Sequence, residues 1–434
     1  MPSPQTTLAL LLGAALGAAG IIQGLNWKSA AATGDLTQLR NQLRIAAEEN
    51  EMLKRENESL RSLAQGGGNL SIPAELISRV EDDLGLQFRT TPAVQRISAE
   101  ELRDRISAEI ESRFGPQGLQ DRQESYSFIG LLRPDNDLLA QLTAAASLGK
   151  SVWFDGGTGE GWMLDKTDLK NIPDQAALCG LLARILQHQH FPPPEDYPGD
   201  DAARAREALH QGSASGVQAR FMAEMARTIG FMPMKQDLAS EYLLAAVSPF
   251  IVGLTNFPNL EGKAYADFLY LRGNDALHAA LRQPPVTTRA VLLPGELYSK
   301  PPAITLPTPP EEPFLSESVG MLGLRLWLEA FGDVGVANEI AMAWKNDRYL
   351  LFPDGESASA LIWEIELESA SAADQLQAVA INLTAALAGQ QADGALGKII
   401  HSSADRYLVV TRPSPTRIRF LNSAVAITAE QLSK

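Results

Sequence analysis

The sequence predicts an α+β protein made of four parts: a membrane anchor or signal segment at residues 1–28, a coiled-coil stalk at 35–65, a helix-rich domain at 72–298 and a small C-terminal α+β domain at 314–434. Three observations predict this order. An uncharged apolar run lies near the start, a heptad pattern follows it directly, and helical periodicity gives way to strand-like runs beyond a proline-dense stretch. A chain of 434 residues is also long enough for more than one hydrophobic core.

The composition excludes several classes of protein. A net charge of -15 would repel a phosphate backbone, so nucleic acid is not expected as a partner. Cys179 is the single cysteine, so an internal disulfide is excluded and the chain must be stable through its cores. We expect Cys179 to be a small buried residue rather than a reactive thiol.

Residues 7–27 form the apolar run, and their number approaches the roughly 20 residues that a helix needs to cross a membrane. A cleaved signal peptide is the alternative, because residues 29–32 are small, although the segment before the run has no Lys or Arg. The nearest basic residues, Lys28, Arg40 and Arg44, follow the run and on their own would favour a cytoplasmic stalk.

A heptad seam begins soon after the apolar run. Its members alternate at spacings of three and four residues: Leu36, Leu39, Leu43, Ala46, Asn50, Leu53, Asn57 and Leu60. Asn50 and Asn57 fall at a positions, where a buried amide costs stability but favours two parallel strands in register. We therefore predict a parallel homodimer through the stalk; the alternative is one amphipathic helix lying on its own domain. Three glycines at 66–68 end the stalk and mark a domain boundary.

The remaining pattern predicts helices first and strands later. Helices are expected at 74–84, 98–114, 175–189, 201–228 and 319–331, and strands at 93–97, 348–352, 360–365, 407–411 and 417–421. Ser98 with Glu101 fits a capping box. Residues 151–154 and 162–164 flank a glycine-rich turn and predict a β-hairpin. The proline-dense stretch at 301–313 predicts a semi-rigid connection.

Two segments carry a resemblance to a known family. Residues 179–191 read CGLLARILQHQHF, and residues 209–214 read LHQGSA. They resemble bacterial envelope proteins related to zincin metallopeptidases of the gluzincin type. In that family an H-E-x-x-H helix runs into a Q-x-Q-H-F ending, and a later helix carries a metal-binding Glu in an L-x-E-G-D-A segment.

Similar stretches at 130–135, 257–262 and 284–288 extend the resemblance over about residues 75–349. The resemblance implies a zincin-like fold for the helix-rich domain. It also implies a location outside the membrane for the globular part, against the weak charge signal beside the apolar run.

The resemblance marks four positions at which the metal site is missing. Gly180 and Arg184 stand where the family has its two ligand histidines. Leu181 stands at the catalytic Glu, and Gln211 stands at the downstream Glu ligand. Glycine and leucine offer a metal no lone pair, and the permanent cation of Arg184 would repel it. We therefore predict a pseudoenzyme with no catalytic residues, no metal and no other cofactor, in which Arg184 fills the zinc space and bonds to Gln211 or Glu207.

Other candidate residues have plainer alternatives. His188, His190 and His210 do not share one helix face, so surface or capping roles are expected rather than a metal cluster. Trp153, Phe154 and Trp162 lie in the predicted hairpin, which in zincins holds an extended peptide by main-chain pairing, and the alternative is that all three are core aromatics.

The sequence thus predicts a single-pass protein of the cell membrane with its globular part outside the cytoplasm. Its function is predicted to be that of an inactive metalloprotease-like module that binds an unidentified peptide or protein at the envelope or serves as a scaffold. Two alternatives stay open: an active hydrolase that uses a non-standard site, and a purely structural dimeric stalk protein.

Overall fold

A computed structural model describes residues 70–194, 196–229, 242–296, 298–330, 332, 334–389, 395–402 and 404–433. The chain divides into two compact units, Met1–Gly66 and Gly67–Lys434, and the described residues belong to the second. The predicted membrane segment and stalk lie outside the described residues. Within these residues, no helix combines the length and the apolar character needed to span a bilayer.

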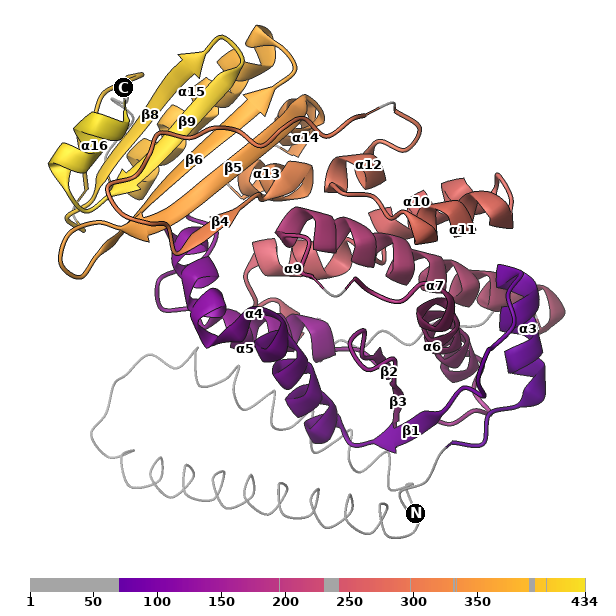
Figure 1. Cartoon of the computed structure of the whole chain (residues 1–434). Helices are drawn as coiled ribbons and strands as arrows, with labels where there is room; N and C mark the ends of the chain where they lie inside the picture. Colours follow the sequence, from indigo (N-terminus) through magenta and orange to yellow (C-terminus); the bar gives the residue numbers. More distant parts are fainter. Residues whose placement is uncertain are drawn as a thin grey trace, which may run out of the picture. The chain divides into compact units, whose positions relative to one another are not determined.

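The fold is α+β, as predicted, and its first part is dominated by helices (Figure 1). These helices are α3 (Ala74–Leu84), α4 (Ala99–Phe128), α5 (Leu138–Ser147), α6 (Ile172–His190), α7 (Asp200–Ile229), α9 (Pro249–Asn256), α10 (Glu261–Tyr270), α11 (Asn274–Arg282) and α12 (Thr288–Leu292). Three short strands accompany them: β1 (Val94–Ile97), β2 (Val152–Phe154) and β3 (Gly161–Leu164). They form a sheet in the order β1-β3-β2, with β1 parallel and β2 antiparallel to β3. The predicted hairpin is confirmed.

Local sequence signals explain how α4 begins and bends. The backbone N–H of Glu101 donates to the Ser98 hydroxyl, and the N–H of Ser98 donates to the Glu101 carboxylate, so the predicted capping box is confirmed. The predicted end at residue 114 coincides with the break between two helical stretches, but the second stretch was not predicted. Gly115 adopts φ 68° and ψ 163°, which breaks the helical geometry, and Pro116 then starts a second helical stretch that continues to Phe128.

Helices α6 and α7 form the centre of the first part. Every residue of α6 from Ala176 to Gln187 is buried, because α3, α7 and the small sheet surround the helix. On its other side α7 packs against α10, where Gly212 and Gly262 allow the two backbones to approach closely. Cys179 is buried in α6, as predicted, and burial raises its pKa to about 12.

The last part is a six-stranded antiparallel sheet with helices. Its strands are β4 (Leu315–Glu317), β5 (Trp344–Pro353), β6 (Ser359–Leu367), β7 (Ile400–His401), β8 (Tyr407–Ser414) and β9 (Arg417–Ser423), in the order β4-β5-β6-β9-β8-β7. Its helices are α13 (Gly320–Glu329), α14 (Val334–Met342), α15 (Ala370–Leu387) and α16 (Ala426–Leu432). The helix predicted at 319–331 and all four strands predicted in this region are confirmed.

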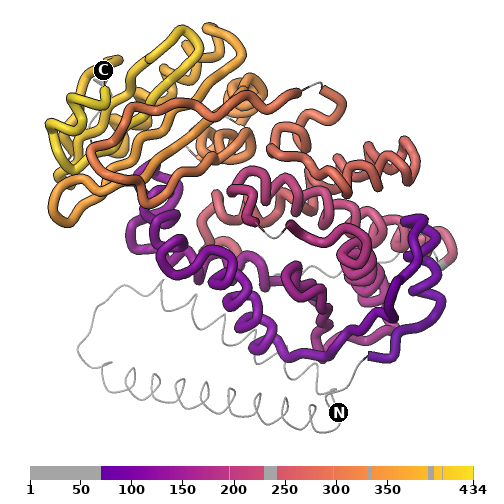
Figure 2. The backbone as a smooth tube through the Cα atoms, viewed as in Figure 1, coloured from indigo at the N-terminus to yellow at the C-terminus, as the bar shows by residue number. Residues whose placement is uncertain are grey.

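Both faces of this sheet are covered. Helices α13 and α15 pack on one face, and the alternate residues Leu350 and Phe352 point to the other, where α16 lies. The proline-dense stretch after α12 also crosses the second face, as the tube in Figure 2 shows. Ile304 is 2% exposed in that cluster, and its carbonyl oxygen accepts a hydrogen bond from Arg348. The stretch is therefore bound to the sheet as well as connecting two parts.

One hydrophobic cluster joins the two parts of the described chain. It contains Tyr126 of α4, Phe250 of α9 and Trp327 of α13 together with Trp363 of the sheet. The Trp327 indole N–H donates 2.8 Å to the carbonyl oxygen of Ile129, which lies 198 residues earlier. The predicted division between 72–298 and 314–434 stays a prediction, and residues from both sides share this core.

Candidate functional site

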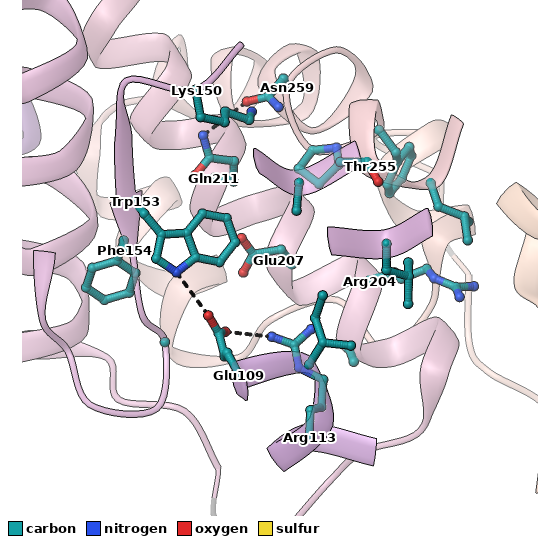
Figure 3. Close-up of a pocket in the computed structure, with 18 of the residues that line it drawn as sticks. Glu109, Arg113, Lys150, Trp153, Phe154, Arg204, Glu207, Gln211, Thr255 and Asn259 are labelled. Atoms are coloured by element: carbon teal, nitrogen blue, oxygen red, sulfur yellow. Dashed lines mark hydrogen bonds and ion pairs between the residues drawn. The ribbon is translucent and has the colours of Figure 1, made fainter. Parts of the chain in front are cut away.

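A cavity of about 490 Å³ opens in the helix-rich part, within the volume range typical of small-molecule and peptide sites. Its walls come from α4, α5, β2, α6, α7 and α9, with the loop after α9 closing one end. Figure 3 shows polar side chains from these elements, including Glu109, Lys150, Glu207 and Gln211, gathered around it. The site is therefore built where the two central helices meet the short hairpin.

The four vestigial positions, which are Gly180, Leu181, Arg184 and Gln211, all line this cavity. The first three lie on α6, where positions 180 and 184 are one turn apart and so share a face. Gln211 lies on α7, which packs against α6. The structure thus brings together positions that are up to 31 residues apart in the sequence, at one cavity.

Arg184 is held beside the cavity by an ion pair. Its side chain is 9% exposed, and its Nη2 donates 2.9 Å to Oε2 of Glu207, one turn before Gln211. The guanidinium also lies 5.0 Å from the centre of the Phe154 ring, a cation–π distance. The predicted pairing with Glu207 is confirmed. The alternative bond to Gln211 is not formed: Nη1 of Arg184 has no hydrogen-bond partner, and the Gln211 side-chain N–H groups donate to Asn259 at 3.0 Å and to Ser215 at 3.4 Å.

Glu109 of α4 is the carboxyl group most altered by the cavity. It accepts hydrogen bonds from the Trp153 indole at 3.1 Å and from Arg113 at 3.0 Å, both drawn in Figure 3. Burial raises the pKa of Glu109 to about 7, and the nearby Arg113 cation opposes this increase. Glu109 can therefore exchange a proton near neutral pH. This property could not be predicted from the sequence, because Glu109 and Arg113 lie four residues apart, which is the spacing of an ordinary surface ion pair.

Lys150, which precedes β2, is a second residue that sequence reasoning missed. Its side chain lines the cavity and is half-buried, and among the described residues no hydrogen bond or ion pair engages its ammonium group. Burial lowers the pKa of Lys150, and the Glu207 carboxylate opposes this decrease. Figure 3 shows Lys150 at the same end of the cavity as Gln211 and Asn259.

The hairpin aromatics divide between the cavity and a core. Trp153 and Phe154 of β2 are half-buried and line the cavity. Trp162 of β3 pairs opposite Trp153 in the register but is only 2% exposed and packs in a small cluster with Ile106. Arg105 covers its ring at 4.7 Å. The side chain of Trp162 is therefore a core aromatic, and Trp153 and Phe154 remain as candidates for ligand contact.

The histidines near the motif make separate contacts. His188 packs edge-on against Phe154, and Nε2 of His190 lies 2.8 Å from the carbonyl oxygen of Gln87. The surface or capping role expected for His210 is wrong, because this side chain is 8% exposed and its Nδ1 lies 3.2 Å from Oε1 of Gln187. Burial lowers the pKa of His210 well below its ordinary value, and Arg184 adds to the decrease.

The donor set at the vestigial positions does not suit a zinc ion. Three oxygen, nitrogen or sulfur ligands are needed, and the amide of Gln211 is the single uncharged polar side chain that these four positions supply. Among the described residues, no group of three or more His, Cys, Asp or Glu side chains is placed to hold a metal. No chemical step through a metal follows from these residues.

Comparison with known proteins finds a match for the C-terminal part alone. Residues 312–432 match a domain of unknown function, DUF8575. No curated protein and no solved structure matches the chain. The matched segment begins just before β4 and ends at α16, so it contains the six-stranded sheet and none of the residues that line the cavity.

Proposed function

We propose that this chain is a membrane-anchored, catalytically inactive metalloprotease-like protein that binds an extended peptide segment at the cell envelope. The observation that carries the proposal is the convergence of Gly180, Arg184 and Gln211 at one cavity beside the free edge of β2. These are the positions at which the resemblance to gluzincin-type proteins expects metal ligands. The arrangement retains a place for peptide and lacks the donors that hydrolysis through zinc would need.

The edge of β2 supplies the binding mode. Among the described strands β2 pairs only with β3, so its second edge has no strand partner. The carbonyl oxygen of Ser151 and the N–H of Asp155 both bond toward β3. Because these directions alternate along a strand, the N–H and C=O groups of Val152 and Phe154 point the other way. A peptide can add a strand there by main-chain hydrogen bonds, with its side chains in the cavity.

A proline at the β2 edge tests this binding mode. Val152→Pro removes one outward N–H, whereas the control Val152→Thr keeps the N–H and the β-branched shape. With the full-length chain and a mixture of N-acetylated hexapeptides, mass spectrometry of the retained peptides should show binding to the wild type and to Val152→Thr. Retention by Val152→Pro should fall by about tenfold. Equal retention by both variants would show that the edge of β2 does not hold the peptide.

Restoring the metal ligands tests the metalloprotease-like frame. The triple change Gly180→His, Arg184→His and Gln211→Glu supplies three zinc ligands with one open position. Metal analysis should find one zinc per chain, and much less in the matched variant that keeps Gln211. A folded triple variant without zinc would mean that the frame is not that of a gluzincin.

The membrane and dimer parts of the proposal rest on residues outside the described ones. We propose one membrane crossing near the N-terminus, an extracytoplasmic globular part and a parallel homodimer through the stalk. Protease added to intact spheroplasts should digest the globular part, and cysteine crosslinking at Asn50→Cys should give a dimer. Protection from protease, or monomer alone after crosslinking, would contradict these parts separately.

A hydrolase with a non-standard site is a second candidate, and Glu109 favours it. A carboxyl group whose pKa is raised to about 7 beside a cavity has the property of a general acid or base. Cleavage of a broad peptide mixture that survives chelation and falls by about 10²-fold or more in Glu109→Gln would support this candidate. Absence of cleavage by the wild type at pH 6 to 8 would remove it.

A further inference from the structure

We infer that the cavity binds a carboxylate group of its ligand between Lys150 and Arg184. The inference rests on the proposed function, because it names the chemistry of the peptide that the cavity would take. The carboxylate can come from the C-terminus of a peptide or from an Asp or Glu side chain.

The charged side chains that line the cavity are mostly positive, whereas the whole chain is negative. The cavity is lined by five cationic side chains and three carboxylates: Arg113, Arg122, Lys150, Arg184 and Arg204 with Glu109, Asp200 and Glu207. Glu317, outside the lining, also pairs with Arg122, so the surplus is one positive charge (five cations against four carboxylates). The chain as a whole carries a net charge of -15. A cationic surplus inside an acidic protein concentrates a small anion at that place.

Unused hydrogen-bond donors locate the anion more closely. Nη1 of Arg184 is buried without a hydrogen-bond partner, although Nη2 of the same side chain is paired with Glu207. The whole Arg184 residue is 8% exposed. The Lys150 ammonium engages no acceptor among the residues described. A buried donor without an acceptor costs free energy, and a ligand oxygen would recover that cost at Nη1 of Arg184 while pairing with the half-buried Lys150 ammonium.

Glu207 connects these two cations. Its carboxylate oxygen Oε2 is 2.9 Å from Nη2 of Arg184, and the same carboxylate acts on Lys150 electrostatically. The single negative charge of Glu207 therefore interacts with the two positive charges of Lys150 and Arg184. One further singly charged anion would neutralise these three groups. A phosphate dianion suits the site less, because it would bring a second negative charge next to Glu207.

The apolar wall identifies the rest of the ligand. Phe154 and Leu181 line the cavity beside these polar groups, and Leu142 and Leu254 line it from α5 and α9. A volume of about 490 Å³ accommodates a few residues of an extended chain and not a folded domain. The ligand is thus a peptide segment that combines an apolar side chain with a nearby carboxylate.

Four hexapeptide libraries provide the test. All are N-acetylated; they end in a free carboxylate or a carboxamide, and they either include or omit Asp and Glu. Retention is measured by mass spectrometry on the full-length chain, on Lys150→Gln, on Lys150→Arg and on the control Lys166→Gln. Lys166 is exposed just after β3 and does not line the cavity.

The libraries with a carboxylate should be retained about tenfold or more above the carboxamide library without acidic residues, since a hydrogen bond to a charged group is worth at least that factor. Lys150→Gln should abolish this preference, whereas Lys150→Arg and Lys166→Gln should keep it. A preference for free termini or for acidic residues identifies the source of the carboxylate. Equal retention of all four libraries by the wild type would overturn the inference and leave peptide binding intact. No retention of any library would overturn both.

Discussion

Gly212→Ala should destabilise the protein, because α7 and α10 touch through their backbones at this residue. A Cβ at position 212 would lie 2.1 Å from the carbonyl carbon of Gly262 and 2.6 Å from the nitrogen of Lys263. Both atoms belong to the backbone, so no side chain can move aside. The two helices would have to separate by about 1 Å or more to regain ordinary contact distances.

The expected loss of unfolding free energy in Gly212→Ala follows from two opposing effects. Overpacking of this kind costs about 1–3 kcal/mol or more, and alanine gains about 1 kcal/mol over glycine inside a helix. The clash involves rigid backbone, so the cost belongs at or above the upper end of that range. We expect Gly212→Ala to lower the free energy of unfolding by about 2 kcal/mol, measured by urea denaturation of the full-length chain with tryptophan fluorescence.

Gly180→Ala is the matched control on the neighbouring helix. Its Cβ would meet the carbonyl oxygen of Ala214 and Oε1 of Gln218 at 3.5 Å, which is ordinary contact. This variant should be as stable as the wild type or more stable by up to about 1 kcal/mol. A Gly212→Ala variant with an unchanged urea midpoint, or a larger loss in Gly180→Ala, would refute the reasoning about backbone contact.

Three further predictions concern charged groups. Burial raises the pKa of Glu109 from 4.5 to about 7, so its stabilising contribution is present below pH 4.5 and lost as the pH rises through 7. At pH 8 the free energy of unfolding of Glu109→Gln, measured in urea, should exceed that of the wild type by up to about 3 kcal/mol, and at pH 5 by much less. The control Glu111→Gln, at an exposed position, should not show this dependence on pH. Glu207→Gln should lower the free energy of unfolding by about 1–2 kcal/mol, because it leaves the buried Arg184 cation without its ion-pair partner. Arg184→Met should lower it less, because no unpaired charge stays buried. A larger loss in Arg184→Met than in Glu207→Gln, measured by urea unfolding, would contradict this explanation. Asp347 is 3% exposed and its carboxylate accepts five hydrogen bonds, so Asp347→Asn should lower the free energy of unfolding by about 3 kcal/mol, and a near-wild-type urea midpoint would be inconsistent with that role.

Local signals made much of the fold predictable. The glycine-rich turn between two aromatic-rich runs identified the β2–β3 hairpin, and the reciprocal Ser98 and Glu101 bonds fixed the start of α4. Elements without such signals were missed. Helix α15, Ala370–Leu387, is rich in alanine and carries few charged residues, so no clear polar face distinguished it from its surroundings.

The candidate site was predictable only where the resemblance marked positions on α6 and α7. Glu109 and Lys150 could not be found in this way, because their properties depend on contacts far along the chain. The Trp153 partner of Glu109 lies 44 residues away, and the Glu207 carboxylate that acts on Lys150 lies 57 residues away, on α7. Burial of a charged group is a tertiary property that residue spacing does not encode.

The proline-dense stretch moves the N-terminal boundary of the folded C-terminal unit to a point before the family match. The family match starts at residue 312, whereas Ile304 and Leu306 already shield the aromatic ring of Phe352 and the neighbouring side chains from water. Both a fragment that begins at residue 312 and one that begins near residue 300 lose the core that this sheet shares with the helix-rich part. The shorter fragment also exposes the apolar face around Phe352, so it should aggregate more readily on purification than the longer one. The folded unit around this sheet therefore includes the proline-dense stretch before residue 312, although the family match does not cover it.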